Sequence, residues 1–505
     1  MSKTLELEAP RFSLLIVVLA SAAVYLPILA FNFNAATDDY YFLLLNPMIR
    51  DTSANGLLNI LTSMSTRYHQ FQPVTFVSFW FEYALWGLRP APYFAVQLFL
   101  HLVNVVLVYA VAKTVCGQEL PALVTALIFG IHPLQVDTLA LIYERKKILS
   151  TAMALFAILQ YIRWKESQDY FTYVTTCLFF CLALLADEGW LITPLVLLAV
   201  DYYRDQRLSS SSILNKIPMI ILSILIAAFT LKGQGSAGMT TPYHFGSFES
   251  QCELVVLIFT DFIMSFFWPV GLSTGYTYSP MELHSMRMVG AVALLAILIV
   301  LFAIAWKKNW RSVCFGLIWF TVCIAPYSQI IPYQIVRADH YMYYALIGLA
   351  ILFAWGIVSF LGEDRRRKAA ILILGAIAIV LGPITLDHLQ YYQTPYQYAR
   401  RFVDTQGWAP SVEVLLARVH EFEGNYELAE RSLLLAIENF EEPFKSGLRL
   451  KLANLYLKMH RIGEAKAQAG LIPPNSPNRE YAQRFLKSLQ TKEIEEDGNY
   501  TDSKK

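Results

Sequence analysis

Long apolar runs alternate with short polar joints along most of this chain. Several of the runs are close to 20 residues long, which is the length of helix that spans a bilayer core of ~30 Å. After Tyr391 the runs stop, and charged, amphipathic helical sequence follows. The pattern predicts an all-α, polytopic membrane protein with a helical C-terminal domain. The apolar runs lie at about 12–31, 92–112, 121–141, 147–163, 170–186, 190–203, 216–232, 251–269, 288–306, 311–330, 340–361 and 368–387.

Basic residues mark four of the joints, and the positive-inside tendency places those four in the cytoplasm. With a cytoplasmic N-terminus, all four fall inside only if the run 251–269, which holds Glu253 and Asp261, does not cross. We therefore predict about 11 transmembrane helices in the cell inner membrane and an outer loop at 32–91. The C-terminal domain then lies on the periplasmic or lumenal side. The basic joints are Arg163/Lys165, Arg204/Arg207/Lys216, Lys307/Lys308/Arg311 and Arg365/Arg366/Arg367/Lys368.

Small and aromatic residues recur in the C-terminal part at the spacing of tetratricopeptide units. Ala429 and Ala465 are 36 residues apart, against a period of ~34. We predict a membrane domain at 1–390, a tetratricopeptide-like domain at 391–490 and a disordered tail at 491–505. The repeat domain is either a packing platform or a docking surface for an acceptor protein. Its matching residues are Gly424, Tyr426, Ala429, Leu433, Ala436, Ala453, Tyr456, Ala465 and Ala469.

Composition agrees with a membrane location. The chain is 56% hydrophobic and 16% charged, whereas an ordinary globular chain is about 25% charged. The net charge of +1 indicates no nucleic-acid partner. The six cysteines lie in or beside apolar runs without metal-type spacing, so the sequence predicts no disulfide framework.

Two adjacent carboxylates, Asp38 and Asp39, follow the first apolar run. A hydroxyl group that attacks a sugar carbon must lose its proton, and an aspartate can accept that proton. A neighbouring carboxylate can raise the pKa of this base or orient the acceptor. The pair is therefore a candidate general base at the outer membrane face, and the alternative of two solvated surface groups stays open.

Further polar residues occur in the outer loop and the next helix. His69 and Gln72 lie in the loop and are candidate supporting or acceptor-binding residues. His101 and Asn104 lie about one turn apart inside an apolar run, where unpaired polar groups are costly. Hydrogen bonding between helices is the simpler interpretation of that second pair.

A basic cluster at a predicted outer joint departs from the positive-inside tendency. The run Glu144-Arg145-Lys146-Lys147 follows His132 and Asp137. Cations on the outer face suit a lipid phosphate, and they can stabilise a phosphate leaving group as its charge develops. Arg145, Lys146 and Lys147 are therefore candidate donor-phosphate ligands, with phospholipid headgroup contact as the alternative.

Charged residues also gather at two other predicted outer joints. One joint carries Asp187 and Glu188, and a later one carries Arg337 and His340. We predict that Arg337 and His340 bind the donor phosphate. Supporting roles are predicted for His132, Asp137, Glu144 and Glu188.

With these residues in place, the chain resembles the GT-C glycosyltransferases. It is most similar to the transmembrane and tetratricopeptide-repeat O-mannosyltransferases, and its short repeat region suggests a bacterial relative. The resemblance follows an ordered set of stretches: Asp38-Asp39, Gln72 to Thr75, His101 to Asn104, His132 to Asp137, Arg145, Asp187-Glu188, Pro269 to Ser273 and Arg337 to Tyr344.

The resemblance implies Asp38 or Asp39 as the base, a polyprenyl-phosphate-sugar donor and inversion at the anomeric carbon. Some members of the class use a divalent cation and others use none, and the sequence leaves both open. Three positions depart from the family pattern: Gln72 replaces an arginine, Asp187 a lysine and Glu144 a glycine. These changes alter the charge near the expected donor site.

The leading hypothesis is transfer of one sugar from a polyprenyl-phosphate carrier to a hydroxyl group of an exported protein. One alternative is an enzyme that modifies an envelope glycan or lipid. Two others are a transporter and a non-catalytic scaffold. A transporter predicts ionisable residues along a path through the membrane, whereas most of the charges here gather at joints.

Overall fold

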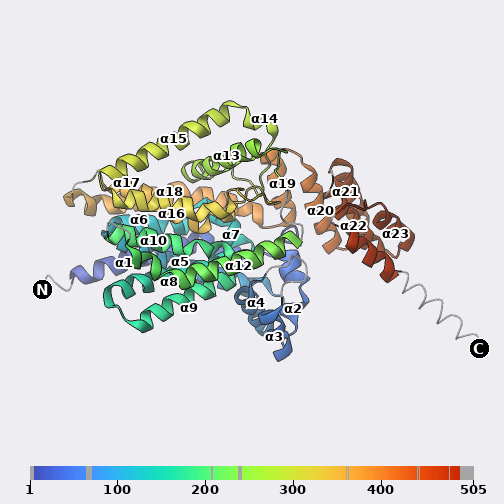
Figure 1. Cartoon of the computed structure of the whole chain (residues 1–505), viewed down its shortest axis with the longest axis horizontal. Coiled ribbons are helices and arrows are strands. Elements are labelled where there is room, and N and C mark those ends of the chain that lie inside the picture. The colour runs from blue at the N-terminus through green and yellow to red at the C-terminus, as the bar shows by residue number, and fades with distance from the viewer. Residues whose placement is uncertain are drawn as a thin grey trace, which may run out of the picture. The chain divides into compact units, whose positions relative to one another are not determined.

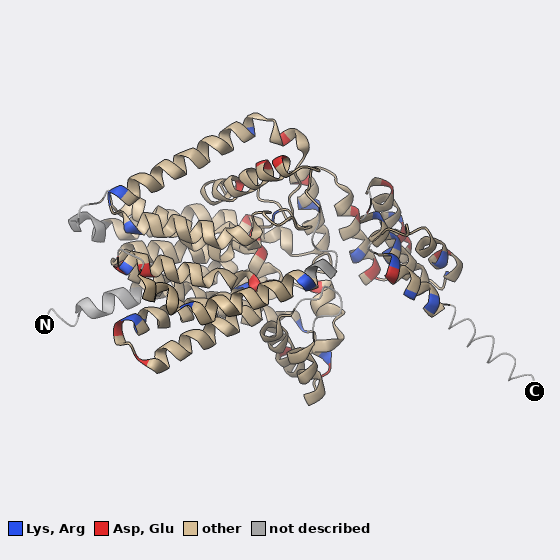
Figure 2. Cartoon of the chain, in the orientation of Figure 1, with Lys and Arg blue, Asp and Glu red and all other residues tan. Residues whose placement is uncertain are grey.

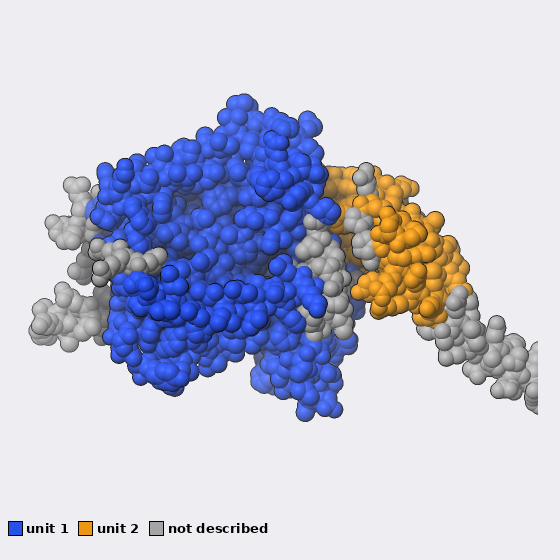
Figure 3. Space-filling model, viewed as in Figure 1, with its two compact units in different colours: residues 1–33, 38–394 blue, residues 34–37, 395–505 orange. Residues whose placement is uncertain are grey.

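The computed structural model describes residues 5–63, 71–205, 209–236, 242–359, 361, 363–440, 442, 444–476 and 478–489. Every regular element in these residues is a helix, so the predicted all-helical class is confirmed. The chain forms two compact units, shown in Figure 3. Unit 1 consists of residues 1–33 and 38–394, and unit 2 of residues 34–37 and 395–505.

Six helices of unit 1 are long and apolar enough to cross a membrane, or seven if the bent pair of α6 (Glu119–Ile131) and α7 (Val136–Ala140) forms one span. The chain is therefore a multi-pass membrane protein. Eleven crossings remain a prediction, because they exclude α13 (Phe248–Phe267), count the bent pair α6–α7 as one span and require five further helices. These five are α8 (Arg145–Ser167), α9 (Tyr170–Ala186), α10 (Thr193–Asp205), α12 (Ile217–Ser236) and α16 (Arg311–Ile324). The six candidate spans are Ser13–Ala30 (in α1 and the turn after it), Pro90–Cys116 (α5), Phe248–Phe267 (α13), Met286–Lys307 (α15), Asp339–Ser359 (ending in α17) and Ala369–Tyr392 (from α18).

Some helices of unit 1 pack on their neighbour in sequence, as Figure 1 shows for α8 with α9, while α6 also packs on α1, α17 and α18. At the α16–α17 crossing, a Cβ on Gly348 would lie 2.4 Å from the carbonyl oxygen of Gly316. Glycine at both positions lets the two backbones meet, as in other close crossings of membrane helices. Figure 2 shows few charged residues along the helices of unit 1 and many in unit 2.

Polar residues inside the bundle are hydrogen-bonded between helices. His101 Nδ1 lies 3.0 Å from the hydroxyl of Tyr343, and its Nε2 lies 3.1 Å from the carbonyl oxygen of Gly130. Asn104 donates to the carbonyl oxygen of Ile148 at 2.8 Å and to Tyr343 at 3.0 Å. These bonds account for the two polar residues that the sequence places in an apolar run.

The loop between α1 (Leu5–Tyr25) and α5 folds into three short helices with clear local signals. They are α2 (Pro47–Arg50), α3 (Ala54–Thr62) and α4 (Pro73–Trp86). Asn46 and Ser53 cap α2 and α3 through their side-chain oxygens. Proline begins both α2 and α4, where its missing N–H costs nothing.

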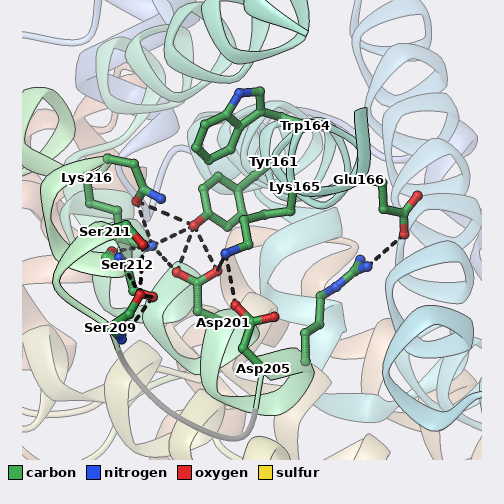
Figure 4. A network of polar contacts seen from close by, with 12 residues as sticks. Tyr161, Trp164, Lys165, Glu166, Asp201, Asp205, Ser209, Ser211, Ser212 and Lys216 are labelled. Carbon is green, nitrogen blue, oxygen red and sulfur yellow. Dashed lines mark hydrogen bonds and ion pairs between the residues drawn. The ribbon is translucent and has the colours of Figure 1, made fainter. Parts of the chain in front are cut away.

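A second polar network joins α8, α10 and the start of α12, and Figure 4 shows it. Lys216 is fully buried and donates to Asp201 and, at 2.7 Å, to the hydroxyl of Tyr161. Tyr161 lies 14 residues after Lys147, about 21 Å further along α8. The network therefore connects α8 to α10 and α12 at the end of α8 that lies away from Lys147.

Unit 2 is a series of packed helices. They are α19 (Pro395–Gln406), α20 (Pro410–Phe422), α21 (Tyr426–Asn439), α22 (Phe444–Lys458) and α23 (Ile462–Gly470). Gly424 has a φ of +79°, which lets the chain turn between α20 and α21. Ala429, Ala436, Ala453 and Ala465 are fully buried in one core. The assignment of these helices to tetratricopeptide units remains a prediction, and the predicted disordered tail lies outside the described residues.

Candidate functional site

Breaks in the helices bring most of the predicted site residues together in unit 1. The helix Glu119–Ile131 (α6) and the segment Pro133–Ala140, which contains α7 (Val136–Ala140), meet at 51°. The bend lies at His132–Pro133, because proline cannot continue a helix. A short turn at Ile142–Glu144 then separates α7 from α8.

The adjacent carboxylates Asp38 and Asp39 have different environments. Asp39 is fully buried, and it accepts the backbone N–H of Tyr143 at 2.7 Å and that of Ile142 at 3.3 Å. Asp38 is half-buried, and its carboxylate has no hydrogen-bond or ion-pair partner among the described residues. It interacts electrostatically with the phenols of Tyr143 and Tyr341. Asp39 thus holds the turn in place, while Asp38 is free to meet a ligand.

Tyr143 connects four parts of the chain. Its ring stacks on Phe42 with centroids 3.8 Å apart, and Lys146 Nζ lies 3.9 Å from its centroid. Its hydroxyl donates to Gln72 Oε1 at 3.1 Å, and Gln72 Nε2 donates to Glu188 at 2.9 Å. Burial, and then the carboxylate of Asp38, raises the pKa of Tyr143 well above its ordinary value. Tyr143 is therefore a neutral hydrogen-bond donor.

Glu144 lies between the side chains of Lys146 and His340. Its Oε1 is 3.4 Å from Lys146 Nζ and 3.9 Å from His340 Nε2. The other ring nitrogen of His340 lies 2.6 Å from Asp137 Oδ2. Although burial raises the pKa of Glu144, the positive charges of His340, Lys146 and Lys147 lower it to about 2. Glu144 therefore stays ionised in neutral solution.

Lys147 is enclosed by aromatic rings and paired with a carboxylate. It donates to the hydroxyl of Tyr327 at 2.9 Å and lies 3.5 Å from Asp187 Oδ2. The ring centroids of Tyr327, Tyr341 and Tyr344 lie 4.5, 5.5 and 6.0 Å from its Nζ. Its side chain is 2% exposed. Its positive charge therefore influences the site electrostatically, without direct contact between the ammonium group and a ligand.

Arg145 is fully buried, and all three of its nitrogens have partners. Its Nε donates to Gln97 at 2.9 Å, Nη1 to Glu82, and Nη2 to the carbonyl oxygen of Tyr93 at 2.6 Å. Burial, offset in part by Arg145, raises the pKa of Glu82 to about 6. A phosphate at Arg145 would have to displace this carboxylate.

Arg337 is held in a separate cluster. Its Nη1 lies 3.6 Å from Asp261, its Nη2 donates to Ser265, and its guanidinium carbon is 3.9 Å from the centroid of Tyr276. The hydroxyl of Tyr276 donates to Asp339 at 2.9 Å. This cluster joins α13 to the loop between α16 and α17.

One of the predicted histidines, His132, lies outside this arrangement. His132 accepts the backbone N–H of Leu134 at 3.2 Å through Nδ1, and its Nε2 is 3.1 Å from the carbonyl oxygen of Phe266. It therefore caps the turn that follows it. His69 lies outside the described residues.

Several residues of the site were not among the sequence-based candidates. The sequence contains an indication for Glu82, because it is the one acidic residue in the aromatic stretch 73–86. Nothing in the sequence distinguishes Tyr143 and Tyr327, because tyrosines are numerous in this chain. In the part of the chain that the structure describes, no three His, Cys, Asp or Glu side chains are grouped so that they could hold a metal ion.

Comparison with known proteins supplies a relation but not a full-length match. No protein-family model matches the chain. It is 33% identical over 134 residues to the mouse protein O-mannosyl-transferase TMTC1, covering 25% of this chain and 14% of the mouse protein. The human TMTC1 protein is 31% identical over 134 residues, covering 25% and 15% of the two chains.

A longer match is to the Caenorhabditis elegans protein O-mannosyl-transferase F38B6.6, which is 24% identical over 234 residues. That match covers 44% of this chain and 32% of the nematode protein. The matched segments therefore span a minor part of each relative. The chain has distant, partial homology to the TMTC protein O-mannosyltransferases, a relation that suggests glycosyltransferase activity.

Proposed function

We propose that this protein transfers one sugar from a polyprenyl-phosphate carrier to a hydroxyl group of an exported protein. The observation that carries the proposal is the contrast between Asp38 and Asp39. One carboxylate is half-buried without a partner, while its neighbour fixes the turn that leads into Glu144 and Lys146. The homology to protein O-mannosyltransferases supports a sugar donor and a protein acceptor.

Asp38 is the general base in this proposal. The acceptor oxygen attacks the anomeric carbon and its proton passes to the Asp38 carboxylate. The bond between the anomeric carbon and the phosphate oxygen breaks, and the polyprenyl phosphate leaves with both bonding electrons. Attack opposite the leaving group inverts the anomeric configuration.

Lys146 and His340 are the proposed phosphate ligands. All five predicted phosphate ligands contact a carboxylate, so exposure separates them. The side chains of Lys146 and His340 are 12% and 13% exposed, whereas those of Arg145, Lys147 and Arg337 are 0–5% exposed. Lys146 has three N–H donors and a single carboxylate partner, so it can also bind the leaving phosphate. Cationic groups at that point stabilise the charge that develops as the phosphate departs.

The proposed location is the cell inner membrane, with the N-terminus in the cytoplasm. The site and unit 2 then lie on the periplasmic or lumenal side, where exported proteins are available. Unit 2 in this proposal is a tetratricopeptide-type domain that presents acceptor proteins. The charge asymmetry of the joints supports this orientation.

The decisive experiment is transfer by the purified full-length protein from polyprenyl-phosphate-mannose to peptides rich in serine and threonine. Asp38→Asn should lower kcat by about 10²–10⁴-fold, the range typical of a lost general base. Asp39→Asn should instead lower thermal stability, because it disturbs two backbone hydrogen bonds. Asp51→Asn, a change at an exposed carboxylate in the same loop, is the matched control. Wild-type rates in Asp38→Asn would overturn the assignment.

A further inference from the structure

Glu144 has a buried oxygen atom that the protein leaves without a hydrogen bond. The residue is 4% exposed, and its Oε2 has no hydrogen-bond partner among the described residues. Its other oxygen, Oε1, faces Lys146 and His340. A buried carboxylate oxygen without a partner has lost its hydration without replacement, so a ligand that donates a hydrogen bond to it gains affinity.

We propose that Glu144 binds a hydroxyl group of the donor sugar and helps to select that sugar. This inference rests on the proposed glycosyltransferase function and adds a specificity-determining residue to it. The family resemblance does not supply this residue, because the pattern that the chain resembles has a glycine where this sequence has Glu144. The carboxylate is therefore a feature of this chain.

The ligand's chemistry follows from the charge state of Glu144. Neighbouring cations lower its pKa to about 2, so the carboxylate is ionised and can only accept hydrogen bonds. A phosphate or a second carboxylate would be repelled. A neutral hydroxyl group is a suitable donor, and a sugar on a phosphate carrier offers several of them.

The position of Glu144 is consistent with a sugar between base and phosphate. Glu144 and Asp38 both interact electrostatically with the phenols of Tyr143 and Tyr341. Lys146, the proposed phosphate ligand, is the ion-pair partner of Glu144 at 3.4 Å. A sugar whose anomeric carbon faces Asp38 and whose phosphate contacts Lys146 has its ring hydroxyls in the neighbourhood of Glu144.

The test compares polyprenyl-phosphate-mannose with its 2-, 3-, 4- and 6-deoxy analogues. In the wild type, removal of one hydroxyl should lower kcat/KM by about 10–100-fold, the cost of one hydrogen bond to a charged group. In Glu144→Gly the decrease in kcat/KM for that deoxy donor should be less than about threefold. The other deoxy donors should keep the kcat/KM, relative to the parent donor, that they have with the wild type. Glu144→Gln, which keeps the shape and one acceptor oxygen, should give an intermediate ratio. Glu166→Gln, a change at an exposed glutamate in the last turn of α8, is the matched control.

Two outcomes overturn the inference. One is a wild type for which no deoxy donor differs from the parent by more than about threefold, and this result needs no variant to fold. The other is an identical set of ratios in wild type and Glu144→Gly. Donor dissociation constants, measured without acceptor, give the same ratios independently of turnover. A protein that binds the donor but transfers nothing contradicts the proposed function alone, because the binding ratios still decide the role of Glu144.

Discussion

At the scale of single residues, burial decides what each charged side chain can do. Lys146 and Arg145 are neighbours in sequence, yet their side chains are 12% and 0% exposed. The sequence predicts both as phosphate ligands because it shows their charge but not their surroundings. Arg145 instead pairs with Glu82, a residue 63 positions away, and no local pattern indicates a partner at that separation.

The Arg145–Glu82 pair gives a first prediction. Arg145→Gln should lower the free energy of unfolding by about 3–5 kcal/mol, because it leaves a buried carboxylate without its cation. The measurement is thermal unfolding in detergent. Arg204→Gln, which breaks an exposed ion pair with Glu166, should cost less than about 1 kcal/mol. The double variant Glu82→Gln/Arg145→Gln should recover part of the loss. A stable Arg145→Gln protein with a raised KM for the donor would instead make Arg145 a phosphate ligand.

The charge state of Glu144 gives a second prediction. Its pKa is about 2 in the folded protein against an ordinary value of 4.5, so its ionised form stabilises the fold above about pH 4.5. That contribution, on the order of 3 kcal/mol, is lost as the pH falls from 4.5 toward 2. The difference in melting temperature between wild type and Glu144→Gln should therefore be constant from about pH 7 to 5 and narrow below about 4.5. A difference that stays constant to about pH 3 would contradict the depressed pKa.

At the scale of elements, the long membrane helices are predictable and the short ones are not. A helix such as α15 has to be apolar along its whole length to face lipid, so its boundaries appear directly in the sequence. Helices α2 to α4 pack on the rest of unit 1, and their short runs have no such requirement. The break between α6 and α7 has a local signal in His132–Pro133, but its 51° angle depends on packing. The contacts around Tyr143 likewise depend on tertiary structure.

Helix α13 gives a third prediction. It is long and apolar enough to cross a membrane, yet both of its halves are bonded to the single loop between α16 and α17. Gln251 donates to the carbonyl oxygen of Gln329 at 2.6 Å, and Ser265 accepts from Arg337. We therefore expect that α13 begins and ends on one side of the membrane, as the charge pattern of the joints also predicts.

Cysteine labelling measures this topology. In a cysteine-free variant of the full chain, Glu249→Cys in the first turn of α13 and His284→Cys after the helix, both exposed, should react with a membrane-impermeant maleimide from the same side. Ser210→Cys, at the predicted cytoplasmic joint, should react only after the membrane is opened. Labelling of residues 249 and 284 from opposite sides would establish α13 as a crossing helix.

At the scale of the whole molecule, the protein joins a lipid-embedded unit to a charged helical one at Thr394–Pro395. The two units have different surfaces because they meet different solvents. In the candidate spans of α15 and α18, only 11% of the apolar window is buried inside the protein, and large aliphatic side chains such as Ile297 and Ile371 are exposed there. Unit 2 carries ion pairs such as Lys458–Glu421 and Arg484–Glu480, which suit water.

The side of the membrane on which unit 2 lies gives the last prediction. The covalent link to the last membrane helix fixes that side, and an odd number of crossings from a cytoplasmic N-terminus places it outside. A reporter fused after Arg400 should therefore be active only in the external compartment, and one fused after Ser210 only in the cytoplasm. An even number of crossings would reverse the first result and keep the second. A cytoplasmic signal at Arg400 would separate unit 2 from exported acceptors and exclude the role in presenting them that is proposed for unit 2. An external signal would support an odd number of membrane crossings, and that number is odd because α13 does not cross.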